Sequence, residues 1–294
     1  MRSHSQLLQY QVIAPHPLLA SYIGCYWILR TPTGQPARRE LILPDGYAEL
    51  ILNYGKSYTW HNQSQQDKRV IQTVHLVGER DASILVDLEG GLNQIGVKFK
   101  PIGLFVLLRQ PLHELANRMV NLDELSNKAI QELSEQVFEA VTDEAKVEVL
   151  NQFFIKCLLV AELSDSLVEK AMQLIFRHQG NLRIENLTNC LDVHYKTLER
   201  KFKTYIGLTP KVFARVIRFK HTYKQFHTIA AQDPSFFLDL GYYDQNHFIK
   251  DFKYFLHTTP SAYLRKQRSA LSSQMESLSD EIVRRGLVER SQTN

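Results

Sequence analysis

The sequence of 294 residues contains no long apolar run. No stretch approaches the roughly 20 consecutive apolar residues that a membrane-spanning helix needs, and the N-terminal segment lacks the apolar stretch of a secretory signal peptide. We therefore expect a cytoplasmic protein that does not act in a membrane. Because 44% of the residues are apolar, the chain can bury a substantial core, and its length indicates two domains.

Cysteine is scarce, and its spacing carries no metal or disulfide motif. The three cysteines, Cys25, Cys157 and Cys190, are far apart and form no Cys-x-x-Cys or Cys-x-x-His pair. We interpret all three as small buried hydrophobic residues rather than as a redox switch. The sequence also lacks a Gly-x-Ser-x-Gly motif, a phosphate-binding loop and histidines at zinc-ligand spacing. These absences argue against an enzyme and predict neither a cofactor nor a metal site.

Acidic residues are scarce in one block of the chain. Residues 165–268 carry 17 basic and 9 acidic side chains, whereas residues 1–164 carry 15 and 18, and residues 269–294 carry 3 and 4. A compact domain with such an excess of positive charge attracts nucleic acid through counterion release. Charge alone gives no sequence specificity, and a merely solvated basic surface would have the same composition.

The first third of the chain has the pattern of short strands. Over residues 12–105, Val, Ile, Tyr and Trp recur with period two between turns such as Pro44-Asp45-Gly46. This pattern predicts a small antiparallel β-barrel or sandwich. We interpret the Gln-rich segment 57–69 as a loop, and helical patterns follow near residues 103–118, 123–137 and 144–162.

The helix expected over residues 144–162 has an apolar stripe at helical spacing. Its members are Val147, Leu150, Phe154, Cys157, Leu158 and Ala161. Such a stripe must be covered, either by the β-rich part of the same chain or by the same helix of a second subunit. The periodicity leaves both open, so a homodimer through this helix is one expectation.

An internal repeat with a period of 50 residues marks the basic block. Phe202-Lys203 and Thr209-Pro210 recur as Phe252-Lys253 and Thr259-Pro260. In each copy, an apolar segment and a sharp turn precede a basic amphipathic helix. A Thr-capped helix with Pro at its first position follows. This order is the pattern of a helix-turn-helix unit.

One long helix is predicted between the two copies, over residues 210–231. About 20 residues at ~1.5 Å each span roughly 30 Å. That length is close to one turn of B-DNA, about 34 Å, so the helix can place two recognition helices in successive major grooves on one face of the duplex.

Three strings in the basic block, QGNLRIENL, TLERKFKTYIGLTPKVFARVIRFK and LGYYDQNHFIKDFKYFLHTTPSAY, resemble the DNA-binding domain of the AraC/XylS transcription regulators. The N-terminal strings HPLLASYIGCYW, LPDGYAELILNYG and VKFKPIGLF resemble the β-rich domain found ahead of some of these regulators. The resemblance implies an α+β chain of two domains. Residues 1–163 would form a β-rich domain with C-terminal helices for ligand sensing or dimerisation, residues 164–268 a double helix-turn-helix domain, and residues 269–294 a frayed or disordered tail.

The same resemblance implies sequence-specific binding to double-stranded DNA, control of transcription, often activation, and contact with RNA polymerase. A small-molecule effector or dimerisation would exert the control through the N-terminal domain. The effector, the DNA site, the regulated genes and the direction of control do not follow from the sequence.

By position in the family pattern, two sets of residues are expected to contact DNA. They are Tyr195, Lys196, Glu199, Arg200 and Lys203 in the first recognition helix, and Gln245, Asn246, Ile249 and Lys250 in the second. Arginine can bond bidentately to guanine, Gln or Asn to adenine, and Glu can accept from cytosine. As alternatives, Lys196 and Lys250 contact phosphates only, and Glu199 pairs with a neighbouring basic residue.

The second copy departs from the family pattern. Between Ser235 and Gly241 the family has about three more residues, and it has a small residue where this chain has Phe237. His257 also replaces the glycine that the first copy has at Gly207. We therefore expect a short supporting helix, pushed outward by Phe237 unless the backbone is rearranged, and a second unit that reads DNA less specifically.

A β-barrel in the N-terminal domain would enclose a pocket with aromatic walls and a few polar groups. The candidate ligand-binding residues are Trp27, Arg38, Glu49, Trp60, His75 and Arg80. Tyr26 and Trp27 should point to opposite faces of one strand, so at most one of them lines a given cavity. A purely structural role in the core is the alternative for each residue.

Overall fold

The computed structural model describes residues 9–62, 66–109, 111–125, 127–161, 165–229 and 235–265. Strands occupy the first part of the chain and helices the second, so the predicted α+β class is confirmed. The expected tail 269–294 lies outside the described residues. Of the helices within the described ranges, none combines the length and the apolar character needed to cross a membrane.

Two antiparallel sheets form the N-terminal half and enclose an apolar core between them, and we call this two-sheet unit the barrel. The six-stranded sheet has the order β1 (Gln9–Ile13), β2 (Ile23–Arg30), β9 (Asn93–Phe99), β4 (Ala48–Asn53), β7 (His75–Val77) and β10 (Met119–Asn121). The four-stranded sheet has the order β3 (Arg38–Ile42), β8 (Ile84–Leu88), β5 (Tyr58–Asn62) and β6 (Asp67–Ile71).

The six-stranded sheet separates two apolar cores. Tyr26 points into the core that this sheet shares with the neighbouring helices, whereas Trp27 points into the core between the two sheets. The two residues are adjacent in β2, where side chains alternate between faces. The prediction that Tyr26 and Trp27 point to opposite faces of one strand is thereby confirmed.

The segment 57–69, which we interpreted as a loop, contains strand β5 and the start of β6, so that interpretation is wrong. In β5, Tyr58, Trp60 and Asn62 are buried, whereas the intervening Thr59 and His61 are only half-buried. An antiparallel strand with one solvated face carries polar residues at every second position. Because residues 57–69 are mostly polar, their sequence did not indicate that buried and half-buried residues alternate in β5.

Helices cover the outer face of the six-stranded sheet. They are α1 (Gly103–Leu108), α2 (Leu122–Leu125), α3 (Lys128–Glu139) and α4 (Asp143–Leu159), with short 3-10 turns η1 (Pro17–Leu19) and η2 (Leu112–Glu114). The helix expected over residues 103–118 is therefore much shorter than predicted. It ends at Arg109, whose φ of 53° is left-handed and stops the helical hydrogen bonding.

The apolar stripe of α4 is covered by its own chain. Val147, Leu150 and Phe154 are buried in the core beneath the six-stranded sheet. The Phe154 ring meets Phe99 of β9 edge to face, with centroids 5.5 Å apart. Of the two alternatives, the structure shows the intramolecular one for these three residues, whereas Cys157, Leu158 and Ala161 of the stripe are only partly buried.

The three cysteines differ in exposure. Cys25 is buried, Cys157 is half-buried and Cys190 is exposed, so the expectation that all three are buried is met in full only by Cys25 and is wrong for Cys190. It ends helix α6 (Ile184–Cys190), in which Leu187 is buried in the core and Ile184 packs against it.

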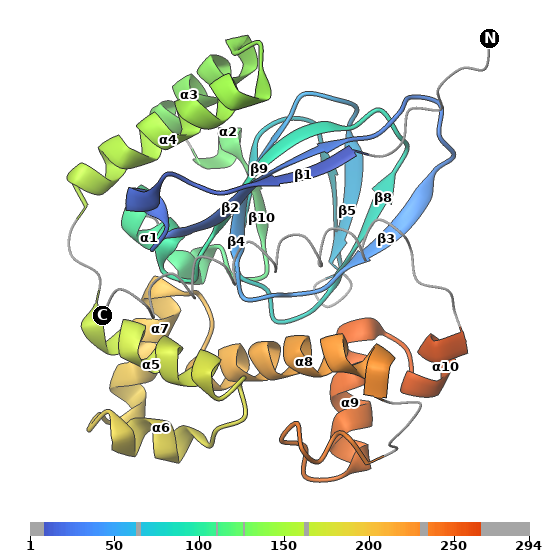
Figure 1. The fold of residues 1–294 in the computed structure, drawn as a ribbon, viewed down its shortest axis with the longest axis vertical. Coiled ribbons are helices and arrows are strands. Elements are labelled where there is room, and N and C mark those ends of the chain that lie inside the picture. Colours follow the sequence, from blue (N-terminus) through green and yellow to red (C-terminus); the bar gives the residue numbers. More distant parts are fainter. Residues whose placement is uncertain are drawn as a thin grey trace.

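The C-terminal half is helical and contains two further apolar cores. Its other helices are α5 (Ser166–Arg177), α7 (Tyr195–Tyr205), α8 (Pro210–Ile229), α9 (Gln245–Leu256) and α10 (Pro260–Arg265). We call the core that contains Phe213 of α8 the first core, and the core that contains Phe219 of α8 the second core. In Figure 1, α8 runs horizontally below the sheets, with α5 to α7 on its left and α9 and α10 on its right.

Ser235–Gly241 forms successive turns, so the second unit has no supporting helix over these residues. Phe236 and Phe237 of this segment are buried in the second core. The backbone rearrangement that would accommodate Phe237 is therefore present. His257 has a φ of 53°, so it takes the left-handed position that Gly207 occupies in the first copy, where φ is 92°.

Candidate nucleic-acid interface and barrel cavity

Helix α7 is anchored by one face and exposes the other. Leu198 and Phe202 are buried in the first core. Lys196, Arg200 and Lys203, spaced by four and three residues, are exposed on a shared face. The helix begins at His194, whose ring accepts a hydrogen bond from the Lys196 backbone N–H at 3.3 Å. His194 is therefore the N-cap residue of α7.

Two residues of the first predicted set are half-buried. Tyr195 lies at the start of α7, and burial raises the pKa of its hydroxyl, with the neighbouring Glu199 carboxylate adding to the rise. Glu199 forms an ion pair with Lys203 one helical turn later, at 3.0 Å. The alternative in which Glu199 pairs with a basic neighbour is therefore the one present in the DNA-free chain.

Helix α9 repeats this arrangement in the second unit. Phe248 and Phe252 anchor it, and Gln245, Asn246 and Lys250 are exposed. Ile249 is only half-buried and packs against the second core. The helix begins at Asp244, whose carboxylate accepts from the His247 backbone N–H at 2.7 Å. A complete second amphipathic helix is thus present, although the described residues Ser235–Gly241 before it form turns and not a supporting helix.

A buried ion network ties α9 to α8. The Asp251 side chain is 4% exposed and accepts from Arg215 Nε and from Arg218 Nη2, both at 2.9 Å. Charge-assisted bonds of this kind are short and directional. Removal of one partner would leave a charge buried without compensation. The orientation of the second recognition helix against α8 therefore depends on these three side chains.

A cavity of about 80 Å³ lies between the two sheets of the N-terminal half. Its apolar wall comes from both sheets, including Leu29, Ile51 and Val86. Four of the six predicted ligand-binding residues line it, namely Trp27, Glu49, Trp60 and Arg80.

The other two predicted residues lie one contact away from the cavity. Arg38 forms an ion pair at 3.5 Å with Glu40, which lines the cavity. The His75 ring bonds through Nε2 to the hydroxyl of Tyr58, another lining residue, at 2.7 Å. Sequence reasoning missed Glu40, Tyr58 and Gln94 as lining residues.

The polar residues that line the cavity differ in how their polar atoms are satisfied. Arg80 donates to the carbonyl oxygens of Ile42 and Leu43, each at 3.2 Å. Burial raises the pKa of Glu49, and the Lys98 ammonium at 3.7 Å opposes that rise. Trp60 Nε1 is buried and has no hydrogen-bond partner among the described residues.

His75 is neutral at physiological pH. Burial lowers its pKa to about 4. Nδ1 lies 3.2 Å from the Thr73 carbonyl oxygen and Nε2 lies 2.7 Å from the Tyr58 hydroxyl. In the neutral tautomer that fits both contacts, Nδ1 donates to the carbonyl and Nε2 accepts from the hydroxyl.

Strand β3 joins the cavity to the second helix-turn-helix unit. Ile42 lines the cavity, whereas its neighbours Leu41 and Leu43 pack against the second core. Ser83, in the loop before β8, donates to the carbonyl oxygen of Phe255 in α9. Two adjoining parts of the barrel wall therefore touch the second unit directly.

The loop between β3 and β4 joins the same barrel to α8. Lys220 of α8 donates to the Asp45 carbonyl oxygen at 3.4 Å and lies over the Tyr47 ring, 4.9 Å from its centroid. Although burial opposes ionisation of the Asp45 carboxyl, Lys98 and Lys220 hold its pKa below the usual value. Asp45 thus interacts with a strand residue of the barrel and with the linking helix.

Comparisons with known proteins divide the chain in the same way. Residues 11–121 match a family described as a domain of unknown function (DUF6597), and residues 187–266 match a family described as a helix-turn-helix domain. The second match includes all of α7, α8 and α9. No curated protein sequence matches the chain.

Among solved structures, the chain is similar to ToxT from Vibrio cholerae O395, with 14% identity over 87% of this chain and 96% of that chain and a TM-score of 0.44. A structure of ToxT from Vibrio cholerae strain SCE256 with a bound unsaturated fatty acid covers 90% of this chain and 97% of that chain, with 14% identity and a TM-score of 0.41. The AraC-like transcriptional activator CuxR covers 74% and 82%, with 14% identity and a TM-score of 0.33. Likenesses this distant carry no argument about function.

Proposed function

We propose that this chain is a DNA-binding transcription regulator with an AraC-type helix-turn-helix domain and that it reads two adjacent major-groove segments of DNA. The observation that supports the proposal is the placement of two anchored recognition helices, α7 and α9, along one connecting helix of 20 residues. At ~1.5 Å per residue, α8 spans about 30 Å, close to the ~34 Å pitch of B-DNA. Each recognition helix exposes polar side chains that suit base edges.

The proposal assigns base contacts to Arg200 in the first unit and to Gln245 and Asn246 in the second. These three side chains are exposed in the DNA-free chain. Arginine suits guanine, and the side-chain amides suit adenine. Lys196, near the start of α7, and Lys250, midway along α9, would contact phosphates or bases. Glu199 would exchange its pairing with Lys203 for a cytosine amino group.

The test is selection of binding sites from a random duplex library by the full-length protein at fixed, near-physiological salt. We expect a motif of two blocks about one helical turn apart. A motif of one block would contradict recognition of two DNA segments and would mean that only one unit recognises bases. Failure to enrich any motif would contradict sequence-specific binding by the chain alone.

We further propose that a small molecule in the barrel cavity controls DNA binding. The walls offer the rings of Trp27 and Trp60, the carboxyls of Glu40 and Glu49, and the Arg80 guanidinium. These groups suit a small ligand with an apolar body and a hydrogen-bond acceptor for the unpaired Trp60 Nε1. Control by pairing of the α4 stripe is less favoured, because Val147, Leu150 and Phe154 of that stripe are buried within their own chain.

A melting-temperature screen of the full-length protein against small metabolites tests this control. A compound at 100 times its Kd should stabilise the fold by about 2.7 kcal/mol. Trp60→Phe retains an aromatic wall but removes the N–H donor, so it should reduce that stabilisation. Compounds that stabilise both proteins equally would contradict binding at Trp60, and a compound that leaves DNA affinity unchanged would contradict control by that compound.

Contact with RNA polymerase belongs to the same proposal and would be tested by transcription from the selected site.

A further inference from the structure

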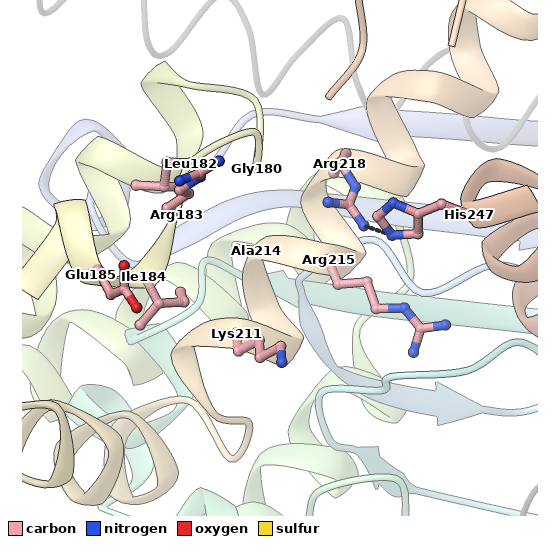
Figure 2. A pocket seen from close by; sticks show the side chains of 10 residues that line it. All are labelled: Gly180, Leu182, Arg183, Ile184, Glu185, Lys211, Ala214, Arg215, Arg218 and His247. Carbon is pink, nitrogen blue, oxygen red and sulfur yellow. Dashed lines mark hydrogen bonds between the residues drawn. The ribbon is translucent and has the colours of Figure 1, made fainter. Parts of the chain in front are cut away.

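A cleft of about 800 Å³ lies between the two helix-turn-helix units, along one side of α8. Figure 2 shows side chains reaching it from three parts of the fold: the start of α6, helix α8 and the start of α9. Its charged and titratable lining residues are Arg183, Glu185, Lys211, Arg215, Arg218 and His247. None of them belongs to the set expected to read bases.

Helix α8 turns a basic stripe toward this cleft. Lys211, Arg215 and Arg218 are spaced by four and three residues, which places them on one face of the helix. Phe213 and Ile217 of the same helix are buried in the first core. The charged side chains therefore follow the length of the cleft while the apolar side chains hold the helix in place.

Two of these cations are held in position before any ligand arrives. Arg215 lies over the Tyr254 ring at 4.1 Å and Arg218 over the Tyr242 ring at 4.7 Å, while both donate to Asp251. A single carboxylate cannot neutralise two guanidinium groups. Arg218 Nε is also buried without a hydrogen-bond partner among the described residues. The network therefore retains positive charge and donor capacity.

The remaining cations are not neutralised by neighbours. Within the described part of the chain, neither Arg183 nor Lys211 forms an ion pair. Of the described residues that line the cleft, Glu185 is the acidic one. The cleft thus has an excess of positive charge, and an anion entering it would meet preset guanidinium groups.

We infer that this cleft binds the sugar-phosphate backbone of DNA between the two major-groove segments, an inference that rests on the proposed function. The cleft lies between the recognition helices: α6 leads into α7, and His247 directly follows Asn246 in α9. Between two successive major grooves on one face, a duplex presents a minor groove with phosphates along both edges. Arg and Lys are the side chains that most often contact such phosphates.

The spacing of the charges favours an extended polyanion over one small anion. From Lys211 to Arg218, α8 advances about 10 Å at ~1.5 Å per residue. Duplex DNA carries one charge per ~1.7 Å of its axis, so several phosphates can lie within that distance. A single phosphate or carboxylate could meet only part of the stripe.

The salt dependence of DNA binding tests the inference. The slope of log K against log salt is negative, and each lost phosphate contact makes it shallower by about 0.9. We choose Arg183→Ala and Lys211→Ala, since changing Arg215 or Arg218 would disturb the buried Asp251. Each single variant should lower affinity about fivefold at 0.15 M salt, and the double variant about 30-fold, for the selected site and random duplex alike. Lys156→Ala, which removes an exposed charge from α4 of the N-terminal half, is the matched control.

The outcomes separate the inference from the proposed function. An unchanged slope in the double variant would overturn the cleft inference while a selected motif still stood. If the double variant has a shallower salt slope but the wild type selects no motif, the cleft inference would stand and sequence-specific reading would be overturned. A change of preferred base in either variant would mean a base contact instead. Finally, if inorganic pyrophosphate raised the melting temperature of the wild type alone while the DNA slope stayed unchanged in the double variant, the cleft would be a small-anion site.

Discussion

Phe237 lies parallel to Phe248, with ring centroids 5.7 Å apart and ring planes 3° apart. Phe248 belongs to the second recognition helix, and Phe237 to the segment of turns where a supporting helix was expected. A stacked ring from this segment of turns therefore supports α9 where a supporting helix was expected. Offset aromatic pairs contribute about 0.5–1.5 kcal/mol beyond their buried area.

Phe237→Ala should consequently weaken the second unit selectively. Truncation of a buried Phe costs about 3–5 kcal/mol where the site cannot collapse. We expect a lower midpoint of urea unfolding and, in site selection, a motif that retains the first block and loses the second. The neighbouring Leu238→Ala is the control, because Leu238 is 50% exposed. Equal loss of both blocks would show that Phe237 supports the whole domain rather than α9.

The parts of the fold that could be predicted are those set by local periodicity. The alternation at Tyr26 and Trp27 indicated opposite faces, and the apolar spacing over residues 210–231 indicated one helix. The same logic gave the wrong result at residues 57–69, because a half-solvated strand and a polar loop have similar compositions.

The parts that could not be predicted depend on residues far apart in the chain. Arg215 and Arg218 meet Asp251 across more than 30 positions, and no short-range spacing indicates such a pair. The barrel cavity is similar: aromatic and charged residue types suggested Trp60 and Arg80, but only strand register brings in Gln94 from β9. Residue type thus indicated candidates, whereas tertiary packing decided which of them share a cavity.

Arg200→Ala should change base preference rather than general affinity. The side chain is exposed on the same face of α7 as Lys196, where an arginine can bond bidentately to guanine. We expect relaxed specificity at one or two positions of the first block, at a cost of about 1–3 kcal/mol on the preferred site.

Repeated site selection and titration on single-base variants would measure this change. Arg118→Ala, which removes an exposed arginine from the N-terminal half, should leave the motif unaltered. If Arg200→Ala weakened binding to every duplex equally, Arg200 would contact a phosphate and not a base.

Gly46→Ala should loosen the contact between the barrel and α8. Gly46 has a φ of 81°, and a Cβ there would lie 2.8 Å from Ile217 Cδ1 on α8. Gly34 has a similar φ of 78°, but nothing lies within 4 Å of the corresponding Cβ. The two substitutions therefore share the cost of a left-handed backbone, about 1–2 kcal/mol, and only one adds a clash.

Urea unfolding of both variants isolates the cost of that clash, since the difference between them removes the shared backbone effect. We expect Gly46→Ala to be the less stable and to increase hydrogen exchange in the first half of α8. Equal stability would mean that the Ile217 side chain moves aside and that the loop does not constrain α8.

His75 should make the fold less stable in mild acid. Because burial lowers its pKa from 6.5 to about 4, the unfolded chain binds this proton more readily than the folded one between those values. Stability therefore rises with pH across that window, is fully present above pH 6.5 and is lost as the pH falls toward 4. The full contribution is about 3 kcal/mol by linkage. The difference in urea midpoints between the wild type and His75→Gln from pH 4 to pH 7 would record it, because the raised pKa values of Glu49 and Glu79 give the opposite trend in both proteins.

His75→Gln keeps a donor and an acceptor near Thr73 and Tyr58 without a titrating ring, so its stability should depend less on pH in this window. His113→Gln, which changes an exposed histidine, is the control and should retain the wild-type slope. Other carboxyls with lowered pKa, such as Asp143 beside Arg30, lose their stabilising charge only below about pH 4, because the unfolded pKa of aspartate lies there. A wild-type slope retained by His75→Gln between pH 4.5 and 6.5 would therefore mean that a group other than His75 takes up the proton.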